Sequence, residues 1–416
     1  MEIFQYFWDR FAVYESETDN FRYIDLLHLL FDPGVPESKN QTIRVTWAIL
    51  KSLIVMQYFF LMYQLLRICF FLPIDIDAFM AVFNMGFIWT VALSRGICFA
   101  IYRRELNQLK KYVNARSCQR DNPVAKEFRK NTYRQNLKLA TIFQLYTVIN
   151  VSIWCFTEFR TNDNFDIPLP MHLLNDKLRL SIEFFYMCVC TTWSITCWIN
   201  FLQFGMILNC LRTELKIVVM QFEELFPKIR NELEIDDLRN LEPIKRRRFW
   251  IELDDAFINA LADHSMFLKH HKQLKAASSS NFLIVFSSAM VLISMNMFLF
   301  IIDPSVKRIP LLVVSCQFAF EVFICCYLFD SLEQENNHIK HHVYAIDWMT
   351  RRDNDLQRRR FRSIRQNALF LQLQTNAGLK IRAGGMFDLN LVSFSTLINL
   401  VYSMLTFLLR TRQVEF

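Results

Sequence analysis

The histidines are the residues whose grouping comes closest to that of a metal site. His270 and His271 are adjacent, and His338, His341 and His342 lie close together. Neither group belongs to an HExxH motif, and no cysteine pair has the spacing of a zinc ribbon. Basic residues surround both groups, which favours a solvated helix face. We therefore expect no metal site.

The residue patterns of the common enzyme classes are also missing. With 7 glycines in 416 residues, the chain has neither a GxxxxGK[ST] phosphate loop nor a GxGxxG turn. No GxSxG segment presents a serine nucleophile. The sequence predicts no catalytic residue, no cofactor and a function other than catalysis.

Two runs of basic residues are of the kind that can bind nucleic acid. They occupy 245–248 (Lys-Arg-Arg-Arg) and 358–360 (Arg-Arg-Arg). In a membrane protein such runs more often meet anionic lipid headgroups or the carboxylates of neighbouring helices. We expect contact with membrane lipid and no nucleic-acid partner.

The elements that must position all of these residues are long apolar segments. Hydrophobic side chains make up 53% of the chain and aromatic ones 15%, and charge is segregated from them along the sequence. About 20 apolar residues in helical form match the ~30 Å hydrocarbon core of a bilayer. The chain is therefore predicted to be an all-α polytopic membrane protein with seven transmembrane helices. The predicted spans are 45–66, 78–101, 138–159, 180–210, 281–302, 311–330 and 387–409.

Several ionisable residues lie within these spans or at their edges, among them Lys51, Arg67, Arg95, Lys138, Glu183 and Glu321. Charges at membrane depth are costly and usually face protein or water, so Arg95 and Glu321 are candidates for an internal role. Lys51, Arg67 and Lys138 are expected to lie near the interfaces, with their charged ends reaching the headgroups.

Basic residues are distributed unequally between the two sides of the predicted membrane. The loops on one side, together with the N-terminal segment, hold 36 Lys and Arg residues, and those on the other side hold 7. The positive-inside rule then predicts a cytoplasmic N-terminus and an extracellular C-terminus. The predicted regions are 1–44 (cytoplasmic), 45–210 (spans one to four), 211–280 (cytoplasmic helical loop), 281–330 (spans five and six), 331–386 (cytoplasmic helices), 387–409 (last span) and 410–416 (extracellular tail).

The largest predicted cytoplasmic loop contains two amphipathic segments. Apolar residues recur at three- and four-residue steps in 211–226, where Pro227 is expected to break the pattern, and again in 249–275. Because these segments continue spans four and five, they favour a packed cytoplasmic domain.

The C-terminal part of the chain carries an ordered set of short motifs. Tyr344 to Trp348 is followed by the basic run 358–360, by an apolar helical segment at 368–373, by the sequence Ile-Arg-Ala-Gly-Gly at 381–385, and by Tyr402-Ser403 within the last span. This order resembles the C-terminal signature of insect odorant receptors. Val401 stands where the related gustatory receptors and the odorant co-receptor Orco have threonine, which favours a ligand-tuning odorant receptor.

The resemblance implies a ligand-gated, non-selective cation channel. In that family four subunits place their last spans around one pore, and a tuning receptor assembles with Orco as a heterotetramer in the plasma membrane of a sensory-neuron dendrite. The expected ligand is a small volatile odorant. Its identity, the subunit ratio and the host species are left open.

The last span has two faces on a helical wheel. An apolar and aromatic stripe contains Leu391, Phe394, Ile398, Tyr402, Leu405 and Leu409. A polar stripe contains Asp388, Thr396, Asn399, Ser403, Thr406 and Arg410. By resemblance to the family, Leu405 and Leu409 form the constriction, and a closed apolar ring excludes ions by dewetting. We expect Ile398, Tyr402, Leu405 and Leu409 to face the pore, although which face lines the pore along its whole length stays open.

By the same resemblance, the ligand pocket lies in the outer half of the membrane between spans two, three, four and six. Aromatic residues, methionine and a few hydroxyl or amide groups suit a small uncharged volatile. The candidate ligand-binding residues are Phe79, Phe83, Phe87, Tyr146, Asn150, Trp154, Phe184, Phe185, Met187, Cys188, Ser315 and Phe318.

Three alternative functions are compatible with a polytopic membrane protein. A gustatory-type ligand-gated channel shares the topology. A secondary transporter lacks support, because the sequence has no internal repeat and no pair of spans broken by Gly or Pro. A G-protein-coupled receptor is opposed by the predicted cytoplasmic N-terminus.

Overall fold

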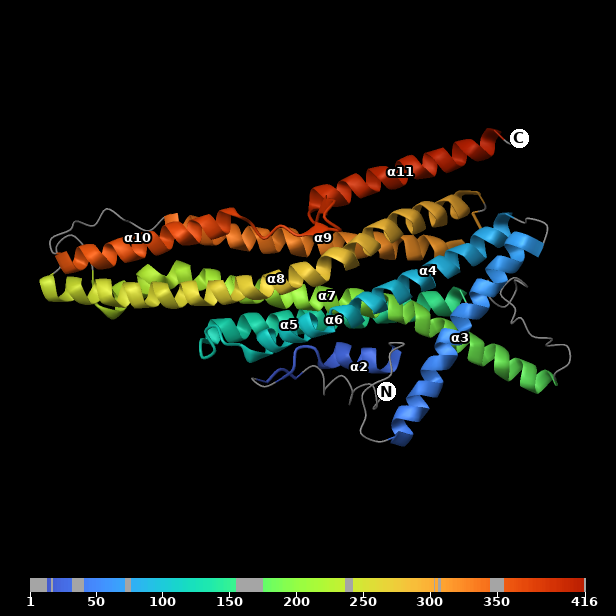
Figure 1. Ribbon diagram of the computed structural model, residues 1–416, viewed down its shortest axis with the longest axis horizontal. Coiled ribbons are helices and arrows are strands. Elements are labelled where there is room, and N and C mark those ends of the chain that lie inside the picture. The colour runs from blue at the N-terminus through green and yellow to red at the C-terminus, as the bar shows by residue number, and fades with distance from the viewer. Residues whose placement is uncertain are drawn as a thin grey trace.

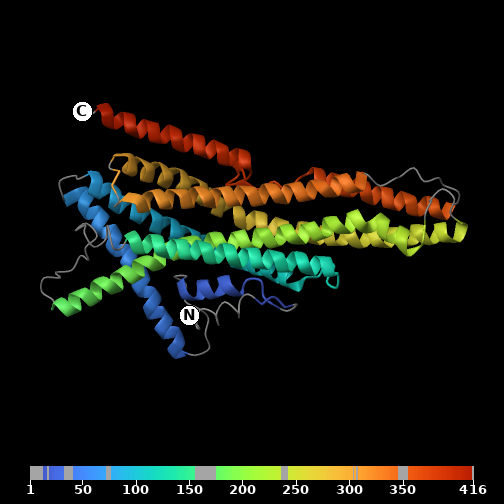
Figure 2. The same ribbon diagram turned by 180° about the vertical axis from the view of Figure 1, so that it is seen from behind.

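The computed structural model describes residues 13–15, 18–31, 41–71, 76–154, 175–235, 242–302, 304–305, 308–344 and 355–414. Its elements in chain order are α2 (Arg22–Phe31), α3 (Gln41–Phe71), α4 (Ile76–Ile101), α5 (Arg103–Ala115), α6 (Pro123–Trp154), α7 (Asp176–Glu232), α8 (Pro243–Ile302), α9 (Ile309–Tyr344), α10 (Asp355–Asn376), β1 (Arg382–Ala383), β2 (Phe387–Asp388) and α11 (Leu391–Val414). They form one elongated bundle, along which α7, α8 and α9 run lengthwise (Figures 1 and 2).

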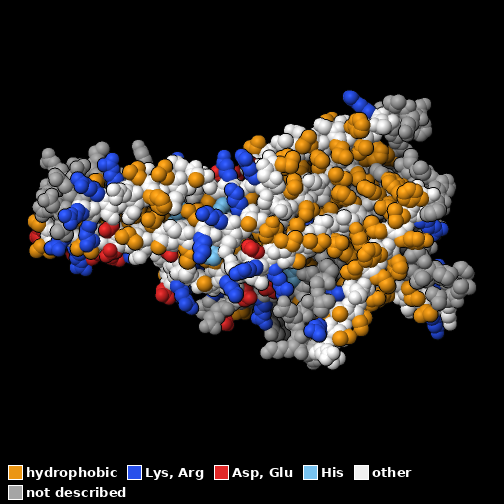
Figure 3. Space-filling view, viewed as in Figure 1, with side chains coloured by type: hydrophobic (Ala, Val, Ile, Leu, Met, Phe, Trp, Pro, Cys, Tyr) orange, Lys and Arg blue, Asp and Glu red, His pale blue; other side chains and the backbone are white. Residues whose placement is uncertain are grey.

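Helices α7 and α8 extend well beyond the thickness of a membrane. They contain 57 and 60 residues, which at 1.5 Å per residue is about 85–90 Å. The two halves of the molecule differ in their surface (Figure 3). Apolar side chains cover the half that contains α3, α4 and α11, and charged side chains are frequent on the half around α10. The segments 211–226 and 249–275 are helical, as predicted, and continue into the charged half.

Six helices of the described chain are long and apolar enough to cross a membrane. They are Gln41–Arg67, Val82–Ile101, Thr192–Glu232, Pro243–Ile302, Ile309–Val343 and Leu391–Thr411. The remaining predicted span, 138–159, overlaps α6 as far as Trp154, where Gln144, Thr147 and Asn150 lower the hydropathy. Residues 155–159 lie outside the described part, so a seventh span stays a prediction.

Helix α11 touches the rest of the subunit along one narrow face. It packs on α8 and α9 through Leu397 and Val401, which are 4% and 7% exposed. Tyr402 and Phe407 are 68% and 67% exposed, and α11 stands apart from the bundle in Figure 1. Most of this apolar helix is therefore left uncovered by the described part of the chain.

The expectation that Pro227 ends the helix of 211–226 is wrong. Pro227 lies inside α7, which continues to Glu232. Proline removes one backbone hydrogen bond and crowds the preceding turn. Here Glu223 and Glu224 on that turn are exposed, so water can solvate the freed carbonyl and the helix persists for a further turn.

The all-α expectation also needs a small correction. Between α10 and α11, β1 and β2 pair as an antiparallel hairpin with Arg382 opposite Asp388 and Ala383 opposite Phe387. The turn carries Gly384 and Gly385 at φ +57° and +76°, a pattern that requires glycine and is typical of tight hairpins. The Ala-Gly-Gly motif therefore builds a hairpin immediately before the last helix.

The expectation that the charged end of Lys51 extends to the headgroups is wrong. Its side chain is buried, and Nζ donates to the carbonyl oxygen of Leu30 at 2.9 Å near the end of α2. The last carbonyls of a helix lack partners within the helix and carry its negative dipole end, so an ammonium group is favourable there. Lys51 ties α3 to α2.

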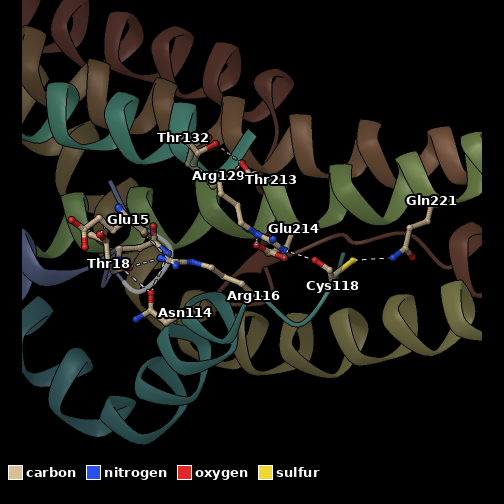
Figure 4. A network of polar contacts seen from close by, with 12 residues as sticks. Glu15, Thr18, Asn114, Arg116, Cys118, Arg129, Thr132, Thr213, Glu214 and Gln221 are labelled. Atoms are coloured by element: carbon tan, nitrogen blue, oxygen red, sulfur yellow. Dashed lines mark hydrogen bonds and ion pairs between the residues drawn. The ribbon is translucent and has the colours of Figure 1, made fainter. Parts of the chain in front are cut away.

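A buried ion pair joins α6 to α7 in the network of Figure 4. The guanidinium of Arg129 donates from Nε and Nη2 to the two carboxylate oxygens of Glu214, each at 2.7 Å. Arg116 donates to the backbone carbonyls of Glu15 and Thr18. The first pair fixes α6 on α7, and Arg116 holds the segment before α2 on the turn between α5 and α6.

Candidate functional site

A small cavity lies among four helices of the apolar half. Its volume is about 50 Å³. Helix α4 contributes Asn84, Met85 and Ile88, α6 contributes Asn150 and Val151, α7 contributes Ser194, and α9 contributes Pro310, Leu311 and Val314. Most of the wall is aliphatic, with two amides and one hydroxyl as its polar groups.

The amides of this cavity are deeply buried and incompletely hydrogen-bonded. Asn84, 3% exposed, donates from Nδ2 to Oδ1 of Asn296 on α8 at 2.6 Å. Within the described part of the chain, Oδ1 of Asn84 and Oδ1 of Asn150 have no hydrogen-bond partner. A buried polar group without a partner costs about 1–3 kcal/mol. The cavity therefore presents unused hydrogen-bonding capacity.

Two contacts connect α6 to α9 beside the cavity. Tyr146 donates from its hydroxyl to the carbonyl of Val313 at 3.1 Å. Gln317 donates from Nε2 to Oγ1 of Thr147 at 2.8 Å, and both side chains are buried. These bonds hold α6 and α9 close together, about one helical turn before Asn150 on α6 and on either side of Val314 on α9.

The predicted aromatic residues of α4 lie on a different face of that helix from the cavity. Phe79, Phe83 and Phe87 stack in succession, with ring centroids 5.8 and 6.0 Å apart. The cavity instead uses residues 84, 85 and 88. The only amide within 78–101 is Asn84, and this is the one sequence signal that marks the cavity face.

The remaining candidate residues are spread over several environments. Phe318 is fully buried and packs on Trp198 with a centroid distance of 4.7 Å. Ser315 is buried and donates to the carbonyl of Leu311 at 3.0 Å. Phe184 and Phe185 are 65% and 46% exposed. The side chains of Trp154, Met187 and Cys188 lie outside the described part. Of the candidates whose side chains are described, the structure brings Asn150 to the cavity wall.

Arg95 on α4 and Glu321 on α9 form a buried ion pair. They lie further along these two helices than the residues that line the cavity. Arg95 Nη1 lies 2.9 Å from Glu321 Oε1, and both side chains are 1% exposed. The same guanidinium donates to the carbonyl of Cys197 at 3.2 Å. Helices α4, α7 and α9 are thus joined at one point, which is the internal role expected for these charges.

Helix α9 connects the cavity to the last helix. Its first turns line the cavity at Pro310, Leu311 and Val314. Further along, the ring of Phe323 meets that of Phe394 on α11 edge-on at 5.5 Å. The predicted pore residues lie beyond this contact: Ile398 is 37% exposed, Tyr402 is exposed, and Leu405 and Leu409 are half-buried.

Comparison with known proteins identifies this arrangement. The family model described as 7tm Odorant receptor matches residues 75–402. The chain belongs to the odorant receptor family. A receptor of this family is a multi-pass membrane protein and no enzyme, and the described residues contain no group of three His, Cys, Asp or Glu side chains suited to a metal ion.

Individual relatives agree with this assignment. Odorant receptor 33b of Drosophila melanogaster is 27% identical over 157 residues, which span 37% of this receptor and 39% of that one. Among solved structures, the olfactory receptor OR5 of Machilis hrabei matches with a TM-score of 0.68 at 14% identity over 95% of this receptor and 97% of that chain. The structure of OR5 in complex with eugenol matches with a TM-score of 0.67 at 13% identity over 95% and 100%. These structures share the fold of this receptor.

Sequence reasoning missed most of the cavity wall in this receptor. Met85, Ile88, Leu311 and Val314 are ordinary aliphatic residues of apolar spans, and nothing in their type distinguishes them from residues that face lipid. Ser194 follows the fully buried Trp193. Only the folded arrangement shows which aliphatic residues surround a void.

Proposed function

We propose that this receptor is the ligand-tuning subunit of an odorant-gated, non-selective cation channel. The observation that carries the proposal is the continuity of α9, which lines a cavity in the apolar half at one end and contacts the exposed helix α11 further along. A ligand that alters the packing around Val314 can thereby shift the position of Phe394. Population shift through one rigid helix is a sufficient physical mechanism.

The channel has seven spans with the N-terminus in the cytoplasm and the C-terminus outside. The 36 to 7 division of basic residues supports this orientation. The charged half of the bundle is too polar for lipid and therefore lies outside the bilayer (Figure 3). An epitope after Phe416 then labels on unpermeabilised cells, and one before Met1 labels only after permeabilisation. The reverse pattern is that of a G-protein-coupled receptor and would reject this topology.

The receptor assembles with the co-receptor Orco as a heterotetramer in the plasma membrane of sensory-neuron dendrites. The support is the uncovered surface of α11. Only 11% of its apolar stretch within Leu391–Thr411 is buried against the described part of the chain. Four such helices around an axis would cover one another and enclose a pore. A small volatile odorant is the ligand, bound in the outer half of the membrane.

The ligand site comprises the described cavity together with the neighbouring candidates. Asn150 lines the cavity wall, and Tyr146, Ser315 and Phe318 lie on the helices that enclose it. Phe79, Phe83 and Phe87 form a layer on α4, and Phe184, Phe185, Trp154, Met187 and Cys188 belong to the outer ends of α6 and α7. In this site a substitution changes odorant potency and leaves unitary conductance unchanged.

The gate is the apolar stripe of α11, with Leu405 and Leu409 at the constriction and Ile398 and Tyr402 on its cytoplasmic side. The two leucines lie one helical turn apart, so both can project into the pore. A ring of apolar side chains excludes ions that cannot shed their water, and a polar side chain lowers that barrier. Leu405→Ser or Leu409→Ser therefore raises ligand-independent current or alters ion permeability when the receptor is co-expressed with Orco.

The matched controls for the gate are Asn399→Ala and Ser403→Ala on the polar stripe. Both residues are exposed on α11, and Ser403 donates to the carbonyl of Asn399 at 2.9 Å. These variants should keep resting current and permeability close to those of the parent channel. If they change permeability while the leucine variants do not, the polar stripe faces the pore instead.

A further inference from the structure

We infer that the cavity selects small aliphatic alcohols, whose hydroxyl group bridges Asn84 and Asn150. This inference rests on the proposed odorant-binding role of the cavity and names the chemical class of its ligand. It is carried by the two buried amides in the wall, by the aliphatic character of the remaining wall and by the small volume. Each of these restricts the ligand in a different way.

Both amide side chains are buried inside the helix bundle. Asn84 and Asn150 are 3% and 5% exposed and come from different helices, α4 and α6, that meet at the cavity. Asn84 is held in place by Asn296, which is fully buried on α8. Within the described chain, one oxygen on each cavity amide lacks a partner. The side chains are oriented, yet their hydrogen bonds are incomplete.

A hydroxyl group is the ligand function that completes them. An amide offers an oxygen that accepts and a nitrogen that donates, and which of the two points into the cavity depends on how the pair with Asn296 is oriented. A hydroxyl donates one hydrogen bond and accepts two, so it satisfies an amide in either orientation. An ether or ester oxygen only accepts, and a hydrocarbon does neither.

The rest of the wall favours an aliphatic chain of few carbons. Met85, Ile88, Val151, Leu311 and Val314 offer methyl and methylene groups, and no aromatic ring from the described residues lines the cavity. At about 50 Å³, it is far below the roughly 300–1,000 Å³ of pockets for drug-sized ligands. A short flexible chain therefore has to displace fewer packed side chains than a ring system does.

The test compares two isomers that differ only in their hydrogen-bonding capacity. 1-Pentanol and butyl methyl ether have the same formula, but only the alcohol can donate. With the receptor and Orco co-expressed, 1-pentanol should activate at a concentration about tenfold lower than the ether, because one net hydrogen bond contributes about 1–1.5 kcal/mol. Benzyl alcohol should be weaker than 1-pentanol.

Variants then assign the preference to the amides. Asn150→Leu and Asn84→Leu keep the approximate shape of the side chain and remove its polar atoms. Each should raise the half-maximal concentration of 1-pentanol about tenfold and change that of the ether little. Asn200→Leu is the matched control, because Asn200 is equally buried, has an amide nitrogen without a partner in the described chain, and does not line the cavity. It should leave the ratio of alcohol to ether potency unchanged.

Binding is also measured without reference to gating. Ligand that binds the folded state raises the unfolding temperature of the purified receptor, so 1-pentanol should stabilise it more than the ether and lose this advantage in Asn150→Leu. Equal effects of the two isomers, or an alcohol preference that survives both leucine variants, would overturn the hydroxyl inference. Selective stabilisation by 1-pentanol without any evoked current would leave the inference standing and reject the proposed channel function.

Discussion

At the scale of single residues, the buried ion pair between Arg95 and Glu321 joins α4 to α9 in the apolar half. Its sequence positions are 226 residues apart, so the sequence could mark both charges as unusual but could not pair them. The reason for marking them is physical: an ionised group in an apolar span needs a partner. The partner became visible only once α4 and α9 were packed together.

Removing one member of this pair should be far more damaging than removing both. Arg95→Leu leaves the Glu321 carboxylate uncompensated and should lower the free energy of unfolding by about 3–5 kcal/mol. The double variant with Glu321→Leu should recover most of that loss. Thermal unfolding of the purified receptor measures both effects.

The control for the ion pair is Arg248→Leu, which disrupts an exposed pair with Glu252 on α8, outside the predicted spans. Exposed pairs contribute about 1 kcal/mol or less, so this variant should unfold close to the parent. A double variant as unstable as Arg95→Leu alone would show that the two charges do not compensate each other.

His271 should make the stability of the folded receptor depend on pH. It lies on α8, ten residues before the predicted span 281–302, and is 6% exposed. Burial lowers the pKa of His271 from 6.5 to about 4, and the nearby Lys275 adds to the effect. His264, also buried on α8, has its pKa lowered for the same reason.

The folded receptor should therefore lose stability as the pH falls from 6.5 towards 4. In this range the unfolded chain binds a proton at His271 and the folded chain does not, so acid favours unfolding. The loss from His271 should reach about 2 kcal/mol at pH 5. Unfolding temperatures measured from pH 7 to pH 5 should fall less steeply in His271→Leu. In His338→Leu, a change at an exposed site on α9, the parent's slope should persist. An identical slope in His271→Leu and the parent would assign the pH dependence to other groups.

At the scale of elements, the sequence predicted the helices better than their ends and connections. Apolar length and amphipathic period were sufficient for α7 and α8, because both signals extend over many turns. The prediction from Pro227 was wrong, because a proline near a solvated helix end destabilises the helix less than one in a packed interior. The two-residue strands β1 and β2 are too short for any periodic signal, and only the Gly-Gly pair pointed to a turn.

The hairpin of β1 and β2 connects the charged half to α11, and its glycines are not equivalent. A Cβ atom on Gly384 would approach Cδ2 of Leu283 on α8 to 2.6 Å, whereas one on Gly385 would meet nothing within 4 Å. The amide of Gly384 also donates to the carbonyl of Ser279 at 2.9 Å. Gly384 is therefore the point at which the hairpin is pressed against α8.

Gly384→Ala should detach the hairpin from α8, whereas Gly385→Ala should cost only the strain of a positive φ, about 1–2 kcal/mol. Hydrogen exchange of the amides of residues 382–389 should accelerate strongly in the first variant and modestly in the second. Because this hairpin positions α11, the first variant should also alter resting current. Equal exchange in both variants would mean that contact with Leu283 does not hold the hairpin.

At the scale of the whole molecule, the described part of the chain leaves much of its last helix uncovered. Its apolar half exposes large side chains to lipid, as a membrane protein should, but α11 exposes both an apolar and a polar stripe. In the proposed tetramer, neighbouring subunits cover this helix. The sequence could predict this helix and its two faces. It could not predict how little of α11 its own subunit covers, because that depends on the path of the hairpin.

The most direct test of the account is a recording from purified components. Receptor and Orco reconstituted together in lipid bilayers, with neither GTP nor G protein present, should give cation currents on addition of 1-pentanol or of another effective odorant. Asn150→Leu should shift the alcohol concentration required and keep unitary conductance, and Leu405→Ser should change resting current or ion selectivity. A bilayer that contains both proteins, binds odorant and passes no current without a G protein would contradict the channel mechanism.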